Sequence, residues 1–286
     1  FQAEDGIRDR SPSRGLGDVY KRQKYKMKHL KTIQYQQEDS IAIISIDRPD
    51  AMNSINEGLR SDLLFAFEKA SQDKNIKIIV LNGNGRNFSA GADLKDKSDL
   101  DKTIEDVLIN EYRPIFEIII NSSKPVIASI HGSAAGIGLS IALTCDLVIM
   151  ADDAFLLSPF TAISLVPDGG LNWTLVNHLG YKRAFQVSIE GQRLDADFCV
   201  KNGIVNKSVP FDKLKEETLS WAKSIAEKAP LSLKGTKKIM RFAESKSWDE
   251  TYKLESQVQQ SLQSSHDFKE GVDAFIEKRE PVFKGE

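Results

Sequence analysis

The sequence predicts an α/β fold in which buried strands alternate with helices, followed by a long helical C-terminal part. Short apolar runs bounded by glycine turns recur up to about Val209, and a segment with helical spacing of apolar residues follows most of them. From Phe211 onward almost every segment keeps the helical spacing. Alternating strands and helices are typical of a parallel sheet, because parallel strands need long crossover connections.

The composition supports a sizeable core. Of 286 residues, 41% are hydrophobic and 28% are charged, and the net charge of −2 argues against nucleic-acid binding. The two cysteines, Cys145 and Cys199, lie in apolar segments, so we expect thiols in a reducing compartment. No apolar run approaches the ~20 residues that span a bilayer. The four histidines are scattered, so no metal site is predicted. We expect a cytoplasmic protein without a membrane partner.

The N-terminus is interpreted separately. Phe1–Gln23 has no apolar periodicity and resembles a translated sequencing adapter, so natural translation is expected to begin at Met27. We therefore expect residues 1–26 to be a non-native or disordered extension, residues 27–210 to form the core, and residues 211–286 to form a helical region.

Ile33–Tyr35 and Ile41–Ile46 are predicted strands joined by a polar turn. Apolar residues then recur at helical spacing up to Ser71, with Asn56 as the expected N-cap, and Ile76–Leu81 is the next strand. Next come a charged loop (Leu94–Ile104) and a helix bent near its proline (Val107–Ile120). They are followed by a strand (Val126–Ile130), a small-residue turn (His131–Gly138), a helix (Leu139–Leu143) and a strand (Asp146–Ala151). We then predict a strand (Ala154–Ser158), a glycine turn (Leu165–Gly170) and three helices (Leu171–Leu179, Tyr181–Ile189 and Asp195–Asn202). The last predicted strand is Ile204–Val209.

Two turns rich in small residues follow two of these strands, Gly83–Lys95 and His131–Gly138. The first turn of a helix leaves its N–H groups without intrahelical partners, and small residues allow a ligand to approach the backbone. Two such turns can direct two N–H donors at one oxygen. The sequence therefore predicts an oxyanion hole, although close strand–helix packing also favours small residues.

Two other site types fit less well. Gly136-Ile-Gly138 opens a helix as a dinucleotide-binding turn does, but Ile141 occupies the place of the third glycine. The segment His131–Gly136, with Ser133 close to His131, does not match the G-x-S-x-G nucleophile elbow of a serine hydrolase.

The chain resembles the crotonase, or enoyl-CoA hydratase/isomerase, superfamily from Ile33 to Phe283. The motifs that carry the resemblance are Arg48-Pro49 with Asn53, Phe88–Leu94, Gly132–Asp146, Pro167–Gly170 and Phe275–Phe283. The resemblance implies a crotonase-like spiral of ββα units. It also implies C-terminal helices that form a homotrimer or a dimer of trimers.

The resemblance further implies an acyl-CoA substrate, no metal and no separate cofactor, since coenzyme A is part of the substrate. It places the oxyanion donors on the N–H groups of Ala90 and Ile137. Phe275 and Lys278 should approach the nucleotide from this or a neighbouring subunit, although Lys278 also fits a solvated helix end. The expected substrate-binding residues are Met52, Ser89, Ala90, Gly91, Ala92, Asp93, Leu94, Gly136, Phe160, Phe275 and Lys278.

Hydratases of this superfamily carry two glutamates, at positions that match Ser140 and Phe160 here. Neither residue exchanges protons near neutral pH, so efficient hydration is not expected. Asp168 stands where single-acid enoyl-CoA isomerases place their base. One carboxylate is enough to move a proton from C2 to C4.

The apolar neighbours expected to raise the basicity of Asp168 are Phe160, Leu165, Val166 and Trp173. A helix N-cap is the structural alternative for Asp168. The first hypothesis is a Δ3–Δ2-enoyl-CoA isomerase with Asp168, Ala90 and Ile137 as catalytic residues. An enoyl-CoA hydratase-like enzyme of fatty-acid or aromatic-acid breakdown and an inactive acyl-CoA-binding homologue remain as alternatives.

Overall fold

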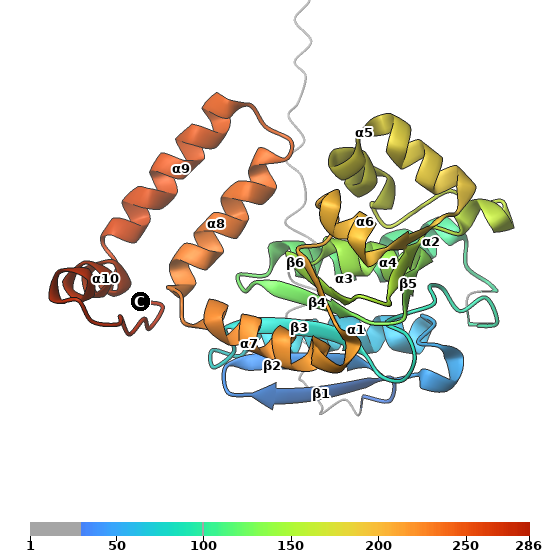
Figure 1. Ribbon diagram of the computed structural model, residues 1–286, viewed down its shortest axis with the longest axis horizontal. Coiled ribbons are helices and arrows are strands. Elements are labelled where there is room, and N and C mark those ends of the chain that lie inside the picture. The colour runs from blue at the N-terminus through green and yellow to red at the C-terminus, as the bar shows by residue number, and fades with distance from the viewer. Residues whose placement is uncertain (1–29, 99) are drawn as a thin grey trace, which may run out of the picture. The chain divides into compact units, whose positions relative to one another are not determined.

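The computed structural model describes residues 30–98 and 100–286, so the prediction for residues 1–26 lies outside the described residues. Lys31–Glu286 form one compact unit. Its large sheet has six strands in the order β1–β2–β3–β4–β6–β9, with β1 antiparallel to β2 and the others parallel (Figure 1). These strands span Ile33–Glu38, Ile41–Ile46, Ile78–Gly83, Val126–Ile130, Leu147–Ala151 and Lys207–Val209.

The first predicted turn is wrong in length. β1 continues to Glu38, which pairs with Ile41, so the chain reverses over Asp39 and Ser40 alone. Asp39 takes a left-handed backbone conformation with φ of 52°, and this conformation suits a two-residue hairpin. The sequence pattern did not predict residues 36–38 as part of β1, because only Ile33 among the six residues of this strand is buried.

A second sheet has three short strands, β5 (Ser133–Ala135), β7 (Phe155–Leu157) and β8 (Arg193–Asp195). β5 lies inside the segment predicted as a turn, and β8 was not predicted. Three-residue strands give too few alternations to be seen in an apolar pattern. Because β5 leads directly into α4 (Gly136–Thr144), this sheet fixes where that helix begins.

The helices agree with the predicted periodicity in most places. Asn56 accepts a hydrogen bond from the amide of Leu59 and caps α1, as predicted. The predicted helix over Val107–Ile120 is instead divided into α2 (Ile104–Val107), a π-helical segment η3 (Leu108–Tyr112) and α3 (Arg113–Asn121). Pro114 lies in the first turn of α3, where a missing N–H breaks no hydrogen bond of the helix. α5 (Leu171–Glu190) breaks at Gly180, with φ of 70°, as the two predicted helices require.

Besides α4 and η3, the helices and 3₁₀ turns in the described part of the chain are α1 (Glu57–Gln72), α2 (Ile104–Val107), α3 (Arg113–Asn121), α5 (Leu171–Glu190), α6 (Ala196–Lys201), α7 (Leu214–Ala226), α8 (Pro230–Ala243), α9 (Trp248–Gln263), α10 (His266–Glu277), η2 (Pro49–Ala51), η4 (Phe160–Ile163) and η5 (Phe211–Lys213).

α4 is the central helix of the core. All nine of its residues are buried, and it packs against α3, α5 and strands of both sheets. α7 packs on β2, β3, β4 and β6. Cys145 and Cys199 are free and buried, which confirms them as core thiols. Among the described helices, none is long and apolar enough to cross a membrane.

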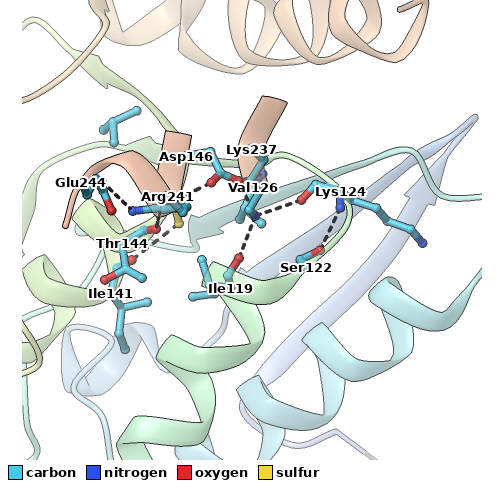
Figure 2. Close-up of polar contacts among 12 residues, drawn as sticks. Ile119, Ser122, Lys124, Val126, Ile141, Thr144, Asp146, Lys237, Arg241 and Glu244 are labelled. Carbon is cyan, nitrogen blue, oxygen red and sulfur yellow. Dashed lines mark hydrogen bonds and ion pairs between the residues drawn. The ribbon is translucent and has the colours of Figure 1, made fainter. Parts of the chain in front are cut away.

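An ionic cluster attaches α8 to this core, as Figure 2 shows. The carboxylate of Asp146, just before β6, accepts hydrogen bonds from Lys237 at 2.7 Å and from the amide of Val126 at 2.8 Å. Arg241 pairs with Asp146 at 3.3 Å and donates to the carbonyl of Thr144 at 2.7 Å. The cluster therefore holds α8 against the C-terminal end of α4.

Candidate active site

The two predicted turns lie side by side. The amide of Ser89 donates to the carbonyl of Ser133 at 3.0 Å, and the amide of Ala135 donates back to Ser89 at 2.9 Å. Gly91 has φ of +96°, and a Cβ there would lie 3.0 Å from the carbonyl oxygen of Ala135 and 3.5 Å from the Cα of Gly136. Glycine is therefore required at this crossing, and the two turns present their backbones to the same region.

Two amides in these turns are free to bind a ligand. Ile137 lies in the first turn of α4, and no side chain caps this helix, so its N–H lacks an intrahelical partner. Ile55 bonds to both neighbours of Ala92, donating to the carbonyl of Gly91 at 2.7 Å and accepting from the amide of Asp93 at 3.0 Å. The N–H of Ala92 itself is left without a protein partner in the described part of the chain.

The prediction that Ala90 supplies an oxyanion donor is wrong. Its amide already donates to the carbonyl oxygen of Met52 at 3.0 Å. The expected role of Ser89 in substrate binding is corrected as well. Its side chain is fully buried, donates to the carbonyl of Asn53 at 2.8 Å and accepts from the amide of Gly91 at 3.2 Å. Ser89 holds the turn together and has no hydroxyl left for a substrate.

The side chains of Asn53, Arg48 and Asp93 form a clamp, the Asn53 clamp, that holds the turn Gly83–Lys95 in place. Asn53 is fully buried, donates to the carbonyls of Asn84 at 2.8 Å and Asn87 at 2.7 Å, and accepts from the amide of Arg48 at 2.9 Å. The guanidinium of Arg48 pairs with Asp93 at 2.9 Å.

The carboxylate of Asp93 belongs to the protein's internal contacts. Burial alone raises the pKa of Asp93, but hydrogen bonds from Arg48 and from the backbone of Lys95 outweigh burial, so the pKa is lowered and the group stays ionised. Asp93 therefore fixes the turn through its side chain instead of offering that side chain to a ligand.

The remaining predicted binding residues divide into two groups. Met52 and Leu94 are exposed, at 57% and 74%, on the segments that flank the free amide of Ala92. Phe275 is 85% exposed on α10, and Lys278 ends that helix. Figure 1 shows α10 far from α4 and β5, so one chain does not bring Phe275 and Lys278 to the two turns. Their role stays a prediction that requires a second chain.

Asp168 lies in the turn that precedes α5. Its Oδ1 is buried and has no hydrogen-bond partner among the described residues. The backbone carbonyl of Asp168 accepts from the hydroxyl of Ser140 at 2.9 Å and from the amide of Leu171 at 3.1 Å. Gly170, with φ of 82°, is the N-cap of α5, and no side chain caps this helix. The N-cap alternative for Asp168 is therefore wrong.

Burial raises the pKa of the Asp168 carboxyl to about 6, and a hydrogen bond from its own backbone opposes the rise only in part. Three of the four neighbours expected to cause this shift are exposed, at 39% for Leu165, 73% for Val166 and 47% for Trp173. The contribution of these three residues to the shift stays a prediction.

The next residue, Gly169, shows what covers the Asp168 turn instead. A Cβ at Gly169, which has φ of +61°, would lie 2.6 Å from the ring of Phe116, 2.7 Å from the side chain of Ile137 and 2.9 Å from Cβ of Ser140. The turn is thus pressed against α3 and the first turns of α4. Asp168 consequently lies next to the helix that carries the free amide of Ile137.

The two positions that carry glutamates in hydratases have other roles here. Ser140 is buried and holds the Asp168 turn through its hydroxyl. The ring of Phe160 is 6% exposed and would lie 3.9 Å from a Cβ at Gly136. Neither position offers a carboxylate to a water molecule. No group of three or more His, Cys, Asp or Glu residues within the described ranges could hold a metal ion.

Two touching glycine turns with free amides and one buried acid form a site that can stabilise a developing oxyanion beside an acid/base. Residues 36–286 match the sequence family described as enoyl-CoA hydratase/isomerase, and the chain belongs to this family.

Known relatives cover nearly the whole described chain. A Rhodobacter capsulatus protein named "probable enoyl-CoA hydratase" is 34% identical over 89% of this chain and 98% of its own. A trans-2-decenoyl-[acyl-carrier-protein] isomerase from Streptococcus mutans is 32% identical over 89% and 98%. The crystal structure of an enoyl-CoA hydratase from Bacillus anthracis superposes with a TM-score of 0.84 at 28% identity, over 90% and 100%.

Proposed function

We propose that this protein is a Δ3–Δ2-enoyl-CoA isomerase in which Asp168 is the only acid/base. The amides of Ala92 and Ile137 form the oxyanion hole for the thioester oxygen. The observation that carries the proposal is the unpartnered, buried Oδ1 of Asp168, pressed against the helix that begins at the oxyanion turn. A carboxylate with an unmet lone pair and a raised pKa is suited to remove a proton near pH 7.

The reaction needs nothing beyond these groups and the substrate. The Asp168 carboxylate takes a proton from C2, and the electron pair of the broken C–H bond forms an enolate conjugated with the C3–C4 double bond. The two amides stabilise the negative charge on the thioester oxygen, and each such donor is worth roughly 3 kcal/mol. Asp168 then returns the proton to C4, which leaves the double bond between C2 and C3. Apart from the coenzyme A of the substrate, no cofactor takes part.

The proposal also assigns Met52 and Leu94 to the walls of the coenzyme A channel. Both are apolar and exposed beside the turn that carries Ala92. Phe275 and Lys278 are assigned to the nucleotide end of a neighbouring subunit in a homotrimer or a dimer of trimers, because α10 lies away from the turns of its own chain.

The test compares two substrates on the purified protein, trans-3-hexenoyl-CoA and crotonyl-CoA, and follows the absorbance of the conjugated enoyl thioester. We expect conjugation of the 3-enoyl substrate without comparable hydration of crotonyl-CoA. Asp168→Asn should lower kcat by roughly 10²–10⁴-fold, the usual contribution of a positioned base, while acyl-CoA still binds. Asp153→Asn, at an exposed aspartate, is the matched control and should leave kcat unchanged.

Two results would contradict the proposal. Fast hydration of crotonyl-CoA would show that Ser140 and Phe160 do not prevent hydratase chemistry. Binding of both substrates without turnover of either would identify an acyl-CoA-binding homologue.

A further inference from the structure

A pocket of about 440 Å³ opens beside the Asp168 turn, and Gly169 and Gly170 form part of its wall. Its size falls in the usual range for small-molecule sites, ~300–1,000 Å³. Helices α3, α4 and α5 and the π-helical segment η3 supply most of its surface. The apolar residues that line it include Ile109, Phe116, Ile120, Leu143 and Trp173.

The charged residues of this pocket neutralise one another. Arg113 pairs with Glu117 at 2.7 Å. Arg241, from α8, pairs with Asp146 at 3.3 Å and with Glu244 at 3.5 Å, and Figure 2 shows it between these partners. Neither arginine is left unpaired, and two carboxylates, Glu117 and Glu244, face the same space. His178 also lines the pocket and is exposed.

We propose that this pocket receives the acyl chain beyond C4 and selects uncharged acyl groups of medium length over short or ω-carboxylated ones. This inference rests on the proposed function, because Asp168 handles C2 and C4 and Gly169 continues directly into the pocket wall. A crotonyl group has no carbon beyond C4 and leaves the pocket unfilled. Each methylene of a longer chain removes apolar surface from water, which favours binding.

A terminal carboxylate gains little in this pocket. It would lose its hydration on entry and find no unpaired cation there, because Arg113 and Arg241 already have partners. The charge pattern thus discriminates against dicarboxylic acyl groups, and the volume discriminates against short ones.

Dissociation constants of saturated acyl-CoAs test the inference, because a saturated chain cannot isomerise and its binding is independent of Asp168 chemistry. The series is butanoyl-, hexanoyl-, octanoyl- and adipoyl-CoA, measured by calorimetric titration. We expect Kd to fall about fourfold per methylene from butanoyl to octanoyl, the factor that corresponds to ~0.8 kcal/mol per buried methylene. Adipoyl-CoA should bind at least about tenfold more weakly than hexanoyl-CoA.

Two variants sharpen the test. Ile120 is 38% exposed, so Ile120→Lys adds a cation to the pocket without burying it fully. This variant should raise the affinity for adipoyl-CoA relative to hexanoyl-CoA by about two- to fivefold, whereas Val176→Lys, on α5 but outside the pocket, should not. Trp173→Ala should flatten the dependence on chain length. His178→Gln should leave both preferences intact.

A flat chain-length series, or adipoyl-CoA binding as tightly as hexanoyl-CoA, would overturn the inference. Graded binding together with no turnover of trans-3-hexenoyl-CoA would overturn only the proposed isomerase reaction and would support the pocket assignment. The two proposals can therefore fail separately.

Discussion

At the scale of single residues, the candidate site contains three groups without a protein partner among the described residues: the Oδ1 of Asp168 and the N–H groups of Ala92 and Ile137. The motif around Asp168 predicts a catalytic role from the sequence, and that role stays a prediction. The choice between Ala90 and Ala92 was not predictable in this way, because Ser89–Ala92 contains only small residues. Pairing with Met52 and Ile55 decides which amide is used internally, and those contacts arise only in the folded chain.

The buried carboxyl of Asp168 predicts a particular pH dependence. The base is active when ionised, so activity is lost as the carboxyl becomes protonated. Since burial raises its pKa from 3.8 to about 6, we expect kcat/KM for trans-3-hexenoyl-CoA to be level above about pH 7. Below about pH 6 it should fall about tenfold per pH unit. A rate profile that stays level down to about pH 5 would show that this carboxyl is not the base.

At the scale of elements, the geometry of the candidate site comes from loops held by buried polar contacts. The strand and helix periodicities predicted α1, α4, α5 and most of the large sheet. They did not predict β5 and β8, because a strand of three residues is too short to show an apolar alternation. They also did not predict the π-helical segment before Pro114. The two small-residue turns are nevertheless positioned by the backbone pairing of β5 and by hydrogen bonds from the Asn53 side chain to backbone carbonyls, and the sequence pattern shows neither of these partners.

Asn53 provides the test at this scale. Asn53→Ala removes three hydrogen bonds and leaves buried carbonyls without donors, so it should lower the free energy of unfolding by about 3 kcal/mol. Because the turn that carries Ala92 loses its support, kcat should also fall by roughly 100-fold, with a smaller change in KM. Urea denaturation and steady-state kinetics measure the two effects. Asn110→Ala, at an exposed asparagine, is the control, and an Asn53 variant with unchanged kcat would refute the positioning role.

At the scale of the whole molecule, buried polar contacts attach helix α8 of the C-terminal part to the core. The helical character of residues 211–286 was predicted from the sequence, but the attachment of α8 was not. Lys237 looks like an ordinary surface lysine in the sequence. Its side chain is only 7% exposed, and it donates to Asp146 and to the carbonyls of Ile119 and Lys124. Burial lowers its pKa, and Asp146 opposes this shift.

Breaking this attachment should be costly. Lys237→Met leaves two carbonyls without a donor and weakens the pairing of Asp146, so we expect a loss of about 3 kcal/mol in unfolding free energy. The neighbouring exposed Lys238, changed to Met, should have an effect below about 0.5 kcal/mol. Equal denaturation midpoints for the two variants would mean that α8 is held by apolar packing instead.

The hydrogen bond from Ser140 to the carbonyl of Asp168 has an evolutionary consequence. On the proposed function, conversion to a hydratase requires glutamates at positions 140 and 160, but Ser140 supports the turn of the proposed acid Asp168 and the ring of Phe160 packs beside Gly136. A glutamate at position 140 would have to occupy space that Gly169 already crowds. The first substitution would therefore damage the proposed isomerase activity before the second could create a hydratase. Such a conversion requires the Asp168 turn to be rebuilt at the same time.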